Sequence, residues 1–226
     1  MDVKVIVTAG GLGSRFGGDF PKQFMALGSK PVLYHAIKTF ESCSFVTEIA
    51  AVVPEEYAIT VKDYGFAKVF YIVAGKNTRA MSVYEALRHF DTGIVLVHDG
   101  VRPLVRKELV RNVAHAAFTH GAAIAAAKVT DTIKKADEQG FVNTTVEREN
   151  LWRAATPQGF KAELLHEAYQ KAIEGGYMEN ATDEAFLVEK LGKPVFLVKG
   201  HEDNIKITHP HDLRIAEMLL HQRDKD

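Results

Sequence analysis

Short apolar runs alternate with amphipathic segments along most of the chain. The apolar runs are rich in β-branched residues and almost continuous, which is typical of strands that are covered on both faces. These predicted strands lie at residues 3–8, 49–53, 69–73, 94–97, 122–129 and 195–198. Segments with a helical period separate them, at residues 31–42, 78–90, 106–118, 161–176, 183–192 and 211–222. The alternation predicts one α/β domain, residues 1–226, built on a mostly parallel, doubly wound sheet.

Residues 132–158 interrupt this alternation. Thr, Ile and Lys alternate before the turn signal EQG, and the run FVNTTV follows, which indicates a β-hairpin. Both predicted strands are short and polar, and a ribbon of this kind is not stable alone. We therefore predict an arm, residues 132–155, that packs on another surface, such as a second copy of the chain, and serves dimerisation. The alternative is a surface excursion without a role.

Composition excludes several classes of protein. The chain has a net charge of −1 over 226 residues, so no overall field favours nucleic acid or a membrane surface. Its one cysteine, Cys43, cannot form a disulfide within a monomer, which fits a reducing cytoplasm. No stretch approaches the length of a membrane span, and none has the features of a signal peptide. We expect a cytoplasmic protein that binds small molecules, with neither nucleic acid nor a membrane as partner.

Glycines follow the first predicted strand, in the segment TAGGLGSRFGGDFPKQF. Gly10, Gly11 and Gly13 remove side chains where backbone N–H groups can approach phosphate oxygens. Arg15 and Lys22 can add charge-assisted hydrogen bonds to the same oxygens. A dinucleotide fingerprint and a Walker A motif both fail here, because their glycine spacing and terminal Gly-Lys-Ser/Thr are missing. The alternative is a glycine turn with two solvated cations.

Three further polar stretches follow predicted strands. In IVLVHDGVRPL, Asp99 ends a strand, where it can meet a metal-bound phosphate or a hydroxyl; the alternative is a cap of a helix that starts near Pro103. In AGKNTRAMSV, Thr78 can cap the next helix and leave the N-terminal amides of that helix for an anion or a base edge. The alternative is an ordinary junction between a strand and a helix. In DNIKITHPHDL, Lys206 lies in a short strand-like segment.

Basic residues gather in these predicted loops and strand ends of a nearly neutral chain. The set comprises Arg15, Lys22, Arg79, Arg102, Arg148 and Lys206. Such a concentration of cations indicates a small anionic substrate with several phosphates. The residues alone therefore indicate a nucleotide or polyphosphate site on a parallel sheet.

Seven stretches, in this order, resemble one family along nearly the whole chain: AGGLGSRFG with PKQF, RAMSV, HDGVRP, KVTDT, VERENLW with TPQGF, TDEA, and DNIKIT. The family is the 2-C-methyl-D-erythritol 4-phosphate cytidylyltransferases of the non-mevalonate isoprenoid pathway. A sister family, the ribitol 5-phosphate cytidylyltransferases, shares several of these stretches. VERENLWRAATPQ and TDEAFLVE are more similar to the methylerythritol branch. The resemblance implies a Rossmann-like sheet of the nucleotide-diphospho-sugar transferase type.

The resemblance also implies a reaction. The phosphate of 2-C-methyl-D-erythritol 4-phosphate attacks the α-phosphorus of CTP, pyrophosphate leaves, and 4-diphosphocytidyl-2-C-methyl-D-erythritol forms. Mg²⁺ comes with CTP, and no direct ligation of a metal by side chains is expected. The family forms homodimers through the arm. The alternatives are ribitol 5-phosphate as acceptor, in wall or capsule precursor synthesis, and a nucleotide-binding regulator without turnover.

Roles for individual residues follow from the same resemblance. The implied catalytic residues are Arg15, Lys22, Arg148 and Lys206. The implied contacts to CTP come from Ala9, Gly10, Gly11, Gly13, Gly75, Asn77, Ser82 and Asp99. The implied contacts to the acceptor come from Asp99, Arg102, Asp131, Thr132, Thr182, Lys206 and, across the dimer, Arg148. The chain departs from the family at Lys76 and Asn77, where two glycines before the TR of the loop are usual, and this leaves the strictness for CTP open.

Overall fold

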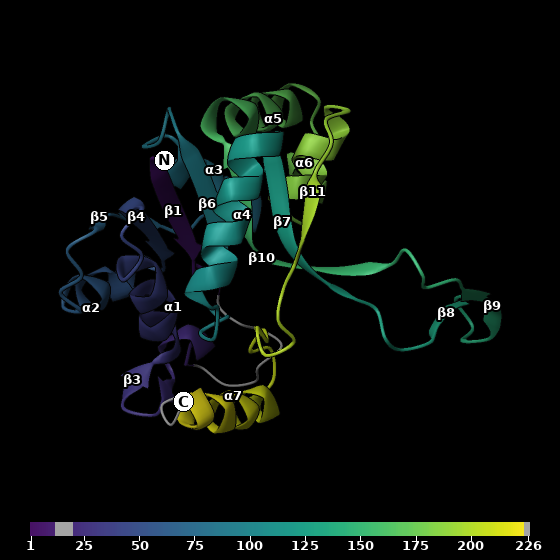
Figure 1. Cartoon of the computed structure of the whole chain (residues 1–226), viewed down its shortest axis with the longest axis horizontal. Helices are drawn as coiled ribbons and strands as arrows, with labels where there is room; N and C mark the ends of the chain where they lie inside the picture. The colour runs from purple at the N-terminus through teal and green to yellow at the C-terminus, as the bar shows by residue number, and fades with distance from the viewer. Residues whose placement is uncertain (12–19, 224–226) are drawn as a thin grey trace.

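A central sheet organises the computed structural model, which describes residues 1–11 and 20–223 (Figure 1). Its seven strands lie in the order β11-β7-β10-β6-β1-β4-β5. Strand β10 runs antiparallel to both of its neighbours, and the other pairs are parallel. The strand bounds are β1 Val3–Thr8, β4 Val46–Val53, β5 Val69–Ala74, β6 Ile94–Asp99, β7 Ala122–Lys128, β10 Trp152–Lys161 and β11 Phe196–Lys199. The predicted mostly parallel, doubly wound sheet is confirmed.

Helices cover both faces of this sheet. Helices α1 (Val32–Glu41) and α4 (Lys107–His120) pack on one face, and α3 (Arg79–Leu87), α5 (Ala162–Glu174) and α6 (Glu184–Lys190) pack on the other. Side chains of a strand alternate between the two layers: Leu96 of β6 joins the first core cluster and Val97 the second. Both are fully buried, which explains why the strands are almost continuously apolar.

Shorter elements complete the fold. They are η1 Lys22–Phe24, β2 Ala26–Leu27, β3 Lys30–Pro31, η2 Glu55–Tyr57, α2 Ala58–Lys62, η3 Met178–Asn180 and α7 Pro210–Arg223. Helix α7 packs its Ala216 against Leu27 and Leu104 in a third, small core cluster. Within the described part of the chain, no helix is both long and apolar enough to cross a membrane.

The predicted hairpin is present as a separate two-stranded antiparallel sheet, β8 (Ile133–Ala136) and β9 (Val142–Val146). It projects far from the body of the molecule (Figure 1). The chain enters it from β7 and leaves it into β10, and the Val129 N–H donates to the Leu151 carbonyl at its root, at 3.1 Å. Most of its side chains are exposed. The arm therefore packs on no other part of its own chain that the structure describes.

Two local expectations are wrong, and one alternative is excluded. The sequence predicts no strand over Trp152–Lys161, yet β10 lies in the middle of the sheet, because pairing with β6 and β7 overrides a segment that contains Pro157 and Gly159. No helix starts near Pro103, since α4 begins at Lys107, so Asp99 caps no helix there. The segment around Lys206 has no strand pairing and is irregular.

Candidate active site

A cavity of about 330 Å³ lies beyond the carboxyl ends of β1 and β6 and beside the N-terminus of α3. The predicted site residues that line it are Ala9, Gly10, Gly11, Lys22, Asn77, Ser82, Asp99 and Lys206. They come from stretches far apart in the sequence, and the sheet brings them together at the edge where ligands bind in open α/β folds. Gly13 and Arg15, also predicted here, lie outside the described residues.

The loops after β1 and β5 pass each other at backbone contact. A Cβ atom on Gly10 would lie 3.1 Å from the Cα atom of Gly75, a tight contact with backbone, so this close approach favours glycine at both positions. The side-chain amide of Gln23 donates to the carbonyls of Ala9, at 2.6 Å, and Gly11, at 3.0 Å. These bonds hold the loop after β1 against η1. Among the described residues, no atom outside the chain neighbours of Gly11 lies within 4 Å of a Cβ atom built on it.

The N-terminus of α3 shapes another wall of the cavity. The hydroxyl of Thr78 accepts from the Met81 N–H at 3.1 Å, so the predicted cap is confirmed. The hydroxyl of Ser82 donates to the Thr78 carbonyl and accepts from the Lys76 N–H, both at 2.8 Å. Ser82 therefore fixes the preceding loop, and its contact with cytosine stays a prediction. Lys76 and Asn77, the positions that depart from the family, both line the cavity.

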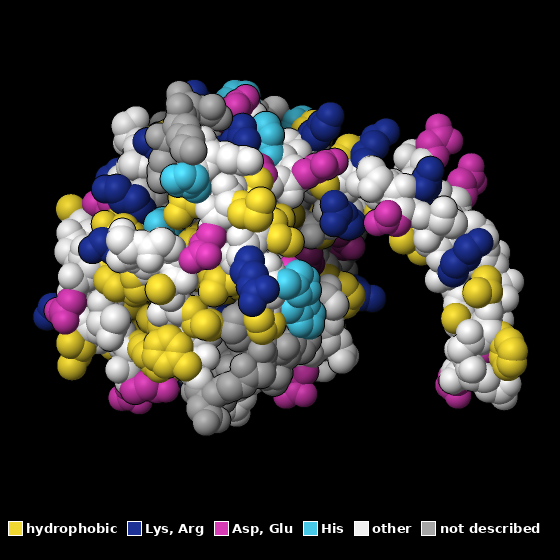
Figure 2. Space-filling view, turned by 90° about the horizontal axis from the view of Figure 1, so that it is seen from below, with side chains coloured by type: hydrophobic (Ala, Val, Ile, Leu, Met, Phe, Trp, Pro, Cys, Tyr) yellow, Lys and Arg dark blue, Asp and Glu magenta, His cyan; other side chains and the backbone are white. Residues whose placement is uncertain are grey.

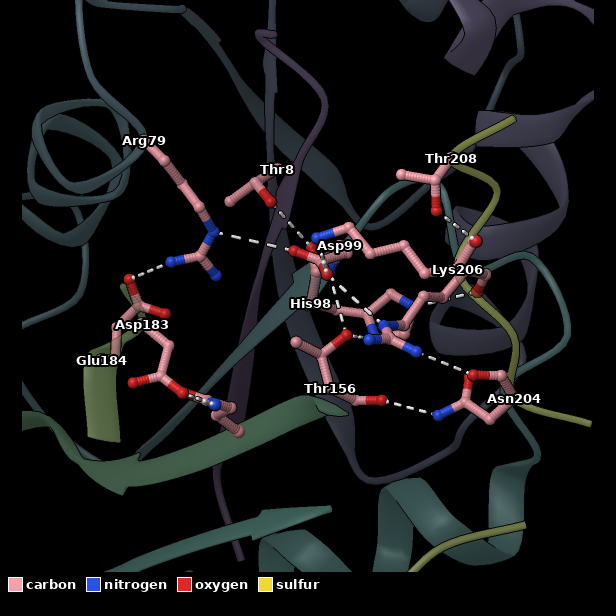
Figure 3. A network of polar contacts seen from close by, with 12 residues as sticks. Thr8, Arg79, His98, Asp99, Thr156, Asp183, Glu184, Asn204, Lys206 and Thr208 are labelled. Atoms are coloured by element: carbon pink, nitrogen blue, oxygen red, sulfur yellow. Dashed lines mark hydrogen bonds and ion pairs between the residues drawn. The ribbon is translucent and has the colours of Figure 1, made fainter. Parts of the chain in front are cut away.

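Asp99 at the end of β6 is surrounded by cations (Figure 3). Its Oδ2 atom lies 2.9 Å from Lys206 Nζ and 3.4 Å from Arg102 Nε, and its Oδ1 atom lies 3.6 Å from Arg79 Nε. Burial opposes ionisation, but Lys206, Arg79 and Arg102 outweigh it and hold the pKa of Asp99 well below its usual range. The site thus presents an ionised carboxylate and three basic groups at one point.

Arg79 links Asp99 to a second, buried carboxylate. Its Nη1 atom donates to Glu184 Oε1 at 2.8 Å, and the Tyr169 hydroxyl donates to the same oxygen at 3.0 Å. Burial opposes the charged form of Arg79, but Glu184 and Asp99 outweigh it and raise its pKa above the usual value. Glu184 is only 1% exposed. The guanidinium is therefore held across the end of the sheet between two carboxylates (Figure 3).

Replacing Glu184 by glutamine should destabilise the protein. The change removes the charge that faces Arg79, and the amide oxygen of glutamine can replace it only as a neutral acceptor, so Asp99 becomes the one charged partner of the guanidinium among the described residues. We expect the free energy of unfolding to fall by roughly 1–3 kcal/mol, in the range for a buried group that loses its partner. Urea denaturation measures this loss, and Glu179→Gln, at an exposed position of η3, serves as the control. An unchanged unfolding midpoint would show that the pair contributes nothing.

A network of buried hydrogen bonds holds the backbone around Asp99 in place. The Thr156 hydroxyl accepts from the Asp99 N–H at 3.1 Å and lies 3.0 Å from His98 Nδ1, so it can donate to that nitrogen. His98 Nε2 lies 3.0 Å from the Arg102 carbonyl, to which it donates in this tautomer. The Asn204 amide donates to the Thr156 carbonyl, and Arg102 donates to the Asn204 carbonyl, both at 2.8 Å. The layer fixes the loop that carries Arg102 and the segment before Lys206.

The buried imidazole predicts a pH dependence of stability. Burial lowers the pKa of His98 from 6.5 to about 4, so His98 stays neutral in the folded protein while the unfolded chain takes up a proton below pH 6.5. Stability is therefore complete above that pH and falls as the pH drops towards 4, by about 3 kcal/mol in total. Urea denaturation at several pH values should show this slope, and His98→Gln should flatten it. Equal slopes in both proteins would contradict the assignment.

A smaller cavity, of about 140 Å³, adjoins the first. Asp99, Arg79 and Lys206 line both, and the predicted acceptor residues Arg102 and Thr182 line the smaller one. The two cavities therefore meet at the charged cluster. This arrangement suits two substrates that must approach each other at one reacting centre.

The remaining predicted acceptor residues lie elsewhere. Asp131, Thr132 and Arg148 belong to the root of the arm, and none of them lines either cavity. Arg148 is exposed and donates to the carbonyl of Thr130. Their contacts with an acceptor stay predictions, and the contact of Arg148 requires a second copy of the chain.

Comparison of the amino-acid sequence with known proteins gives a match along almost its entire length. Residues 3–222 match the family described as 2-C-methyl-D-erythritol 4-phosphate cytidylyltransferase. A relative of that name from Pelotomaculum thermopropionicum is 42% identical over 228 residues, which cover 98% of this chain and 95% of the relative. The chain belongs to this family. Another family member of the same name, from Geobacillus thermodenitrificans, is 41% identical, with 99% of both chains covered.

Solved structures of the family share the fold. The 4-diphosphocytidyl-2C-methyl-D-erythritol synthase from Anaerococcus prevotii matches with a TM-score of 0.86 at 29% identity, covering 97% of this chain and 96% of that chain. The 2-C-methyl-D-erythritol 4-phosphate cytidylyltransferase from Thermus thermophilus gives a TM-score of 0.79 at 34% identity, covering 97% of this chain and 98% of that chain. The resemblance stated from the sequence is confirmed.

Sequence reasoning missed the residues that hold the charged cluster of this family member in place. Glu184 lies 105 positions from Arg79, and no local pattern links the two. Thr156 and Asn204 contact each other across 48 positions and give no signal beyond their place in the TPQGF and DNIKIT stretches. Arg79 itself carried a signal, as a cation at a predicted helix start, although no role was assigned to it.

Proposed function

We propose that the chain is a cytidylyltransferase that transfers CMP from CTP to 2-C-methyl-D-erythritol 4-phosphate and releases pyrophosphate, in the non-mevalonate isoprenoid pathway. Membership of the family supports this function. One observation of the structure carries it: Asp99, with Lys206, Arg102 and Arg79 around it, stands where a larger and a smaller cavity meet. The larger cavity suits a nucleotide, and the smaller one suits the acceptor phosphate.

The reaction is an in-line displacement at phosphorus. An oxygen of the acceptor phosphate forms a bond to the α-phosphorus of CTP, the bond from that phosphorus to the pyrophosphate oxygen breaks, and no covalent enzyme intermediate forms. Lys22 lines the nucleotide cavity and stabilises the charge that develops on the phosphates. The backbone at Gly10 and Gly11 approaches the nucleotide closely. The ionised Asp99 accepts hydrogen bonds from substrate hydroxyls, and Arg102 and Lys206 hold the acceptor phosphate.

Mg²⁺ fits this site as a metal that arrives on the triphosphate. Among the described residues that line the larger cavity, Asp99 is the one carboxylate, and three basic groups already face it. One carboxylate is no cage for a metal, whereas Mg²⁺ typically keeps several waters and binds substrate phosphates. When bound, the metal neutralises and orients the phosphates, and Asp99 is the side chain that can reach it or its waters. Lys22 would then act on the remaining phosphate charge.

Release of pyrophosphate from CTP tests the function. The assay contains Mg²⁺ and, in parallel, 2-C-methyl-D-erythritol 4-phosphate or ribitol 5-phosphate as acceptor. We expect release with the first acceptor; no observation of the structure favours ribitol, and the relatives compared above carry the methylerythritol name. If only ribitol 5-phosphate supported release, ribitol 5-phosphate would be the acceptor in place of 2-C-methyl-D-erythritol 4-phosphate. If neither acceptor supported release, the proposed transferase activity would be refuted, and a nucleotide-binding regulator would be favoured.

Homodimerisation through the arm belongs to the same proposal. The arm projects from the body, and Arg148 at its root lies outside the cavities of its own chain (Figure 1). In a dimer, Arg148 would contact the acceptor in the second copy. A cytoplasmic location stays a prediction, which cell fractionation would test.

A further inference from the structure

The segment that carries Lys206 is irregular, so side-chain contacts must fix its course. Residues 201–208 form no helix and pair with no strand of the described chain, and they contain one turn, at residues 202–203. The Asn204 carbonyl accepts from Arg102 at 2.8 Å, which fixes the part of the segment that follows the turn. The turn itself is held by a second set of contacts, which reaches the end of the last helix.

Asp203, in this turn, binds two arginines from distant parts of the chain. Its Oδ2 atom accepts from Arg106 Nη2 at 2.6 Å and from Arg223 Nη2 at 2.7 Å. Burial opposes ionisation of the carboxylate, but the hydrogen bonds from Arg223 and Arg106 outweigh burial and hold the pKa of Asp203 below its usual value. Two charge-assisted bonds to one mostly buried carboxylate hold its position better than a single exposed ion pair. We call these three residues the Asp203 clamp.

The Asp203 clamp joins three elements beside the site. Arg106 is the residue before α4, Arg223 is the last residue of α7, and Asp203 lies between β11 and α7. The bond between Asp203 and Arg223 closes residues 203–223 into a loop that contains Lys206. Helix α7 lies below the sheet in Figure 1, and Figure 2 shows this side of the body, with the arm extending away from it. The clamp belongs to the body, and none of its residues comes from the arm.

We propose that the Asp203 clamp positions Lys206 against Asp99, so that Arg106 and Arg223 are positioning residues of the transfer reaction. The inference rests on the proposed function, in which Lys206 holds the acceptor phosphate. Lys206 Nζ lies 2.9 Å from Asp99 Oδ2, and Lys206 lines both cavities, whereas neither arginine lines either one. The arginines therefore act through Lys206. Asp203 is three residues before Lys206 in an irregular segment, so a shift of the turn moves the lysine with it.

A clamp that only stabilised the fold would have different consequences. The clamp arginines are partly or fully exposed, and the core is formed by apolar side chains of the sheet and its helices. Loss of the clamp should therefore leave most of the free energy of unfolding in place and release the segment before Lys206. The effect should appear on the acceptor more than on CTP, because the loop after β1 is held separately, by Gln23.

Steady-state kinetics of pyrophosphate release tests the clamp in the full-length chain. Arg223→Met removes the charge and keeps an apolar stem. We expect kcat/KM for 2-C-methyl-D-erythritol 4-phosphate to fall about tenfold while the KM for CTP changes less than about twofold. Arg223→Lys keeps a charge that can reach Asp203 and should retain most of the wild-type value. Equal values for Arg223→Met and wild type, or an equal loss in Arg223→Lys, would overturn the proposal.

Two further variants complete the comparison. Arg214→Met is the matched control, because Arg214 is exposed on the same helix and has no ion pair with any described residue. Arg106→Met removes the other contact to Asp203 and should lower kcat/KM for the acceptor less than Arg223→Met does, because the side chain of Arg106 is 46% exposed and that of Arg223 is 26% exposed. Urea denaturation shows which variants remain folded, and either arginine variant alone suffices for the test.

Chemical labelling tests the position of the Lys206 ammonium without turnover. Acetic anhydride at a low ratio to protein labels accessible lysines, and mass spectrometry measures each site. Arg223→Met should raise the labelling of Lys206 relative to exposed Lys30 at least about threefold, and Arg214→Met should not. An unchanged ratio in Arg223→Met would overturn the positioning role. If the wild type released no pyrophosphate with either acceptor, the proposed function would fail, and the labelling ratio would still decide whether the clamp holds Lys206.

Discussion

Replacing Lys22 by alanine should lower the turnover of CTP by about a hundredfold or more, the usual effect of losing one electrostatic contact to a transition state. Lys22 lies in η1 and lines the nucleotide cavity with its side chain mostly buried. If the contact forms mainly in the transition state, kcat falls and the KM for CTP changes little. Steady-state kinetics of pyrophosphate release separates the two parameters.

Lys30→Ala provides the control for the loss of a lysine. Lys30 is exposed, lies 5.2 Å from the centre of the Tyr34 ring, and does not line the nucleotide cavity. This variant should keep the wild-type rate, and both variants should unfold at about the wild-type urea concentration. A wild-type rate for Lys22→Ala would refute the role of Lys22 at the phosphates.

Removal of residues 134–146, the arm beyond its root, should give a monomer with weak binding of the acceptor. Ile133 pairs with Val146 in the hairpin, so a short link can join the chain at this point. The removed side chains are nearly all exposed, and the sheet of the body should keep its stability. Because Arg148 then no longer reaches a second copy, the KM for 2-C-methyl-D-erythritol 4-phosphate should rise while CTP binding persists.

Two measurements test this deletion: sedimentation gives the oligomeric state, and substrate titration gives the affinity for the acceptor. The wild type, at the same concentration, is the reference for both measurements. A shortened chain that remains dimeric and keeps its affinity for the acceptor would reject the arm as a dimerisation element. In that case Arg148 would have no role across subunits, and its place outside both cavities would mark it as a surface residue.

The sequence predicted most of the fold because most of the strands carry a clear local signal. Runs such as 94–97 are short, apolar and buried on both faces, and helix starts carry local signals such as the cap at Thr78. Strand β10 carries no such signal. Its sequence WRAATPQGFK contains proline, glycine and glutamine, and only the space between β6 and β7 makes it a strand. Tertiary contacts, not the local sequence, therefore determine that this segment is a strand.

The site was predictable where loops follow strands and unpredictable where distant residues meet. Asp99 and Lys22 stand in recognisable stretches, and both line the cavity as expected. Gly10 stands in such a stretch too. Its close contact with Gly75 gives a packing reason for glycine at this position, whereas the sequence suggested only the approach of a phosphate to the backbone. Glu184 was missed because its partner Arg79 is remote in sequence, and a pair of this kind has no period to detect.

The position of Lys206 near the end of the chain has a consequence for biosynthesis. The Lys206 ammonium makes the shortest contact to Asp99 among the three cations, and the next residue is anchored by the bond from the Ile207 N–H to the Val101 carbonyl, at 2.9 Å. The ribosome delivers this lysine only after the whole central sheet. A chain still under translation can thus form its nucleotide loops while the cluster lacks its closest cation. A chain released before residue 206 would contain every strand of the central sheet but would lack the cation that lies closest to Asp99.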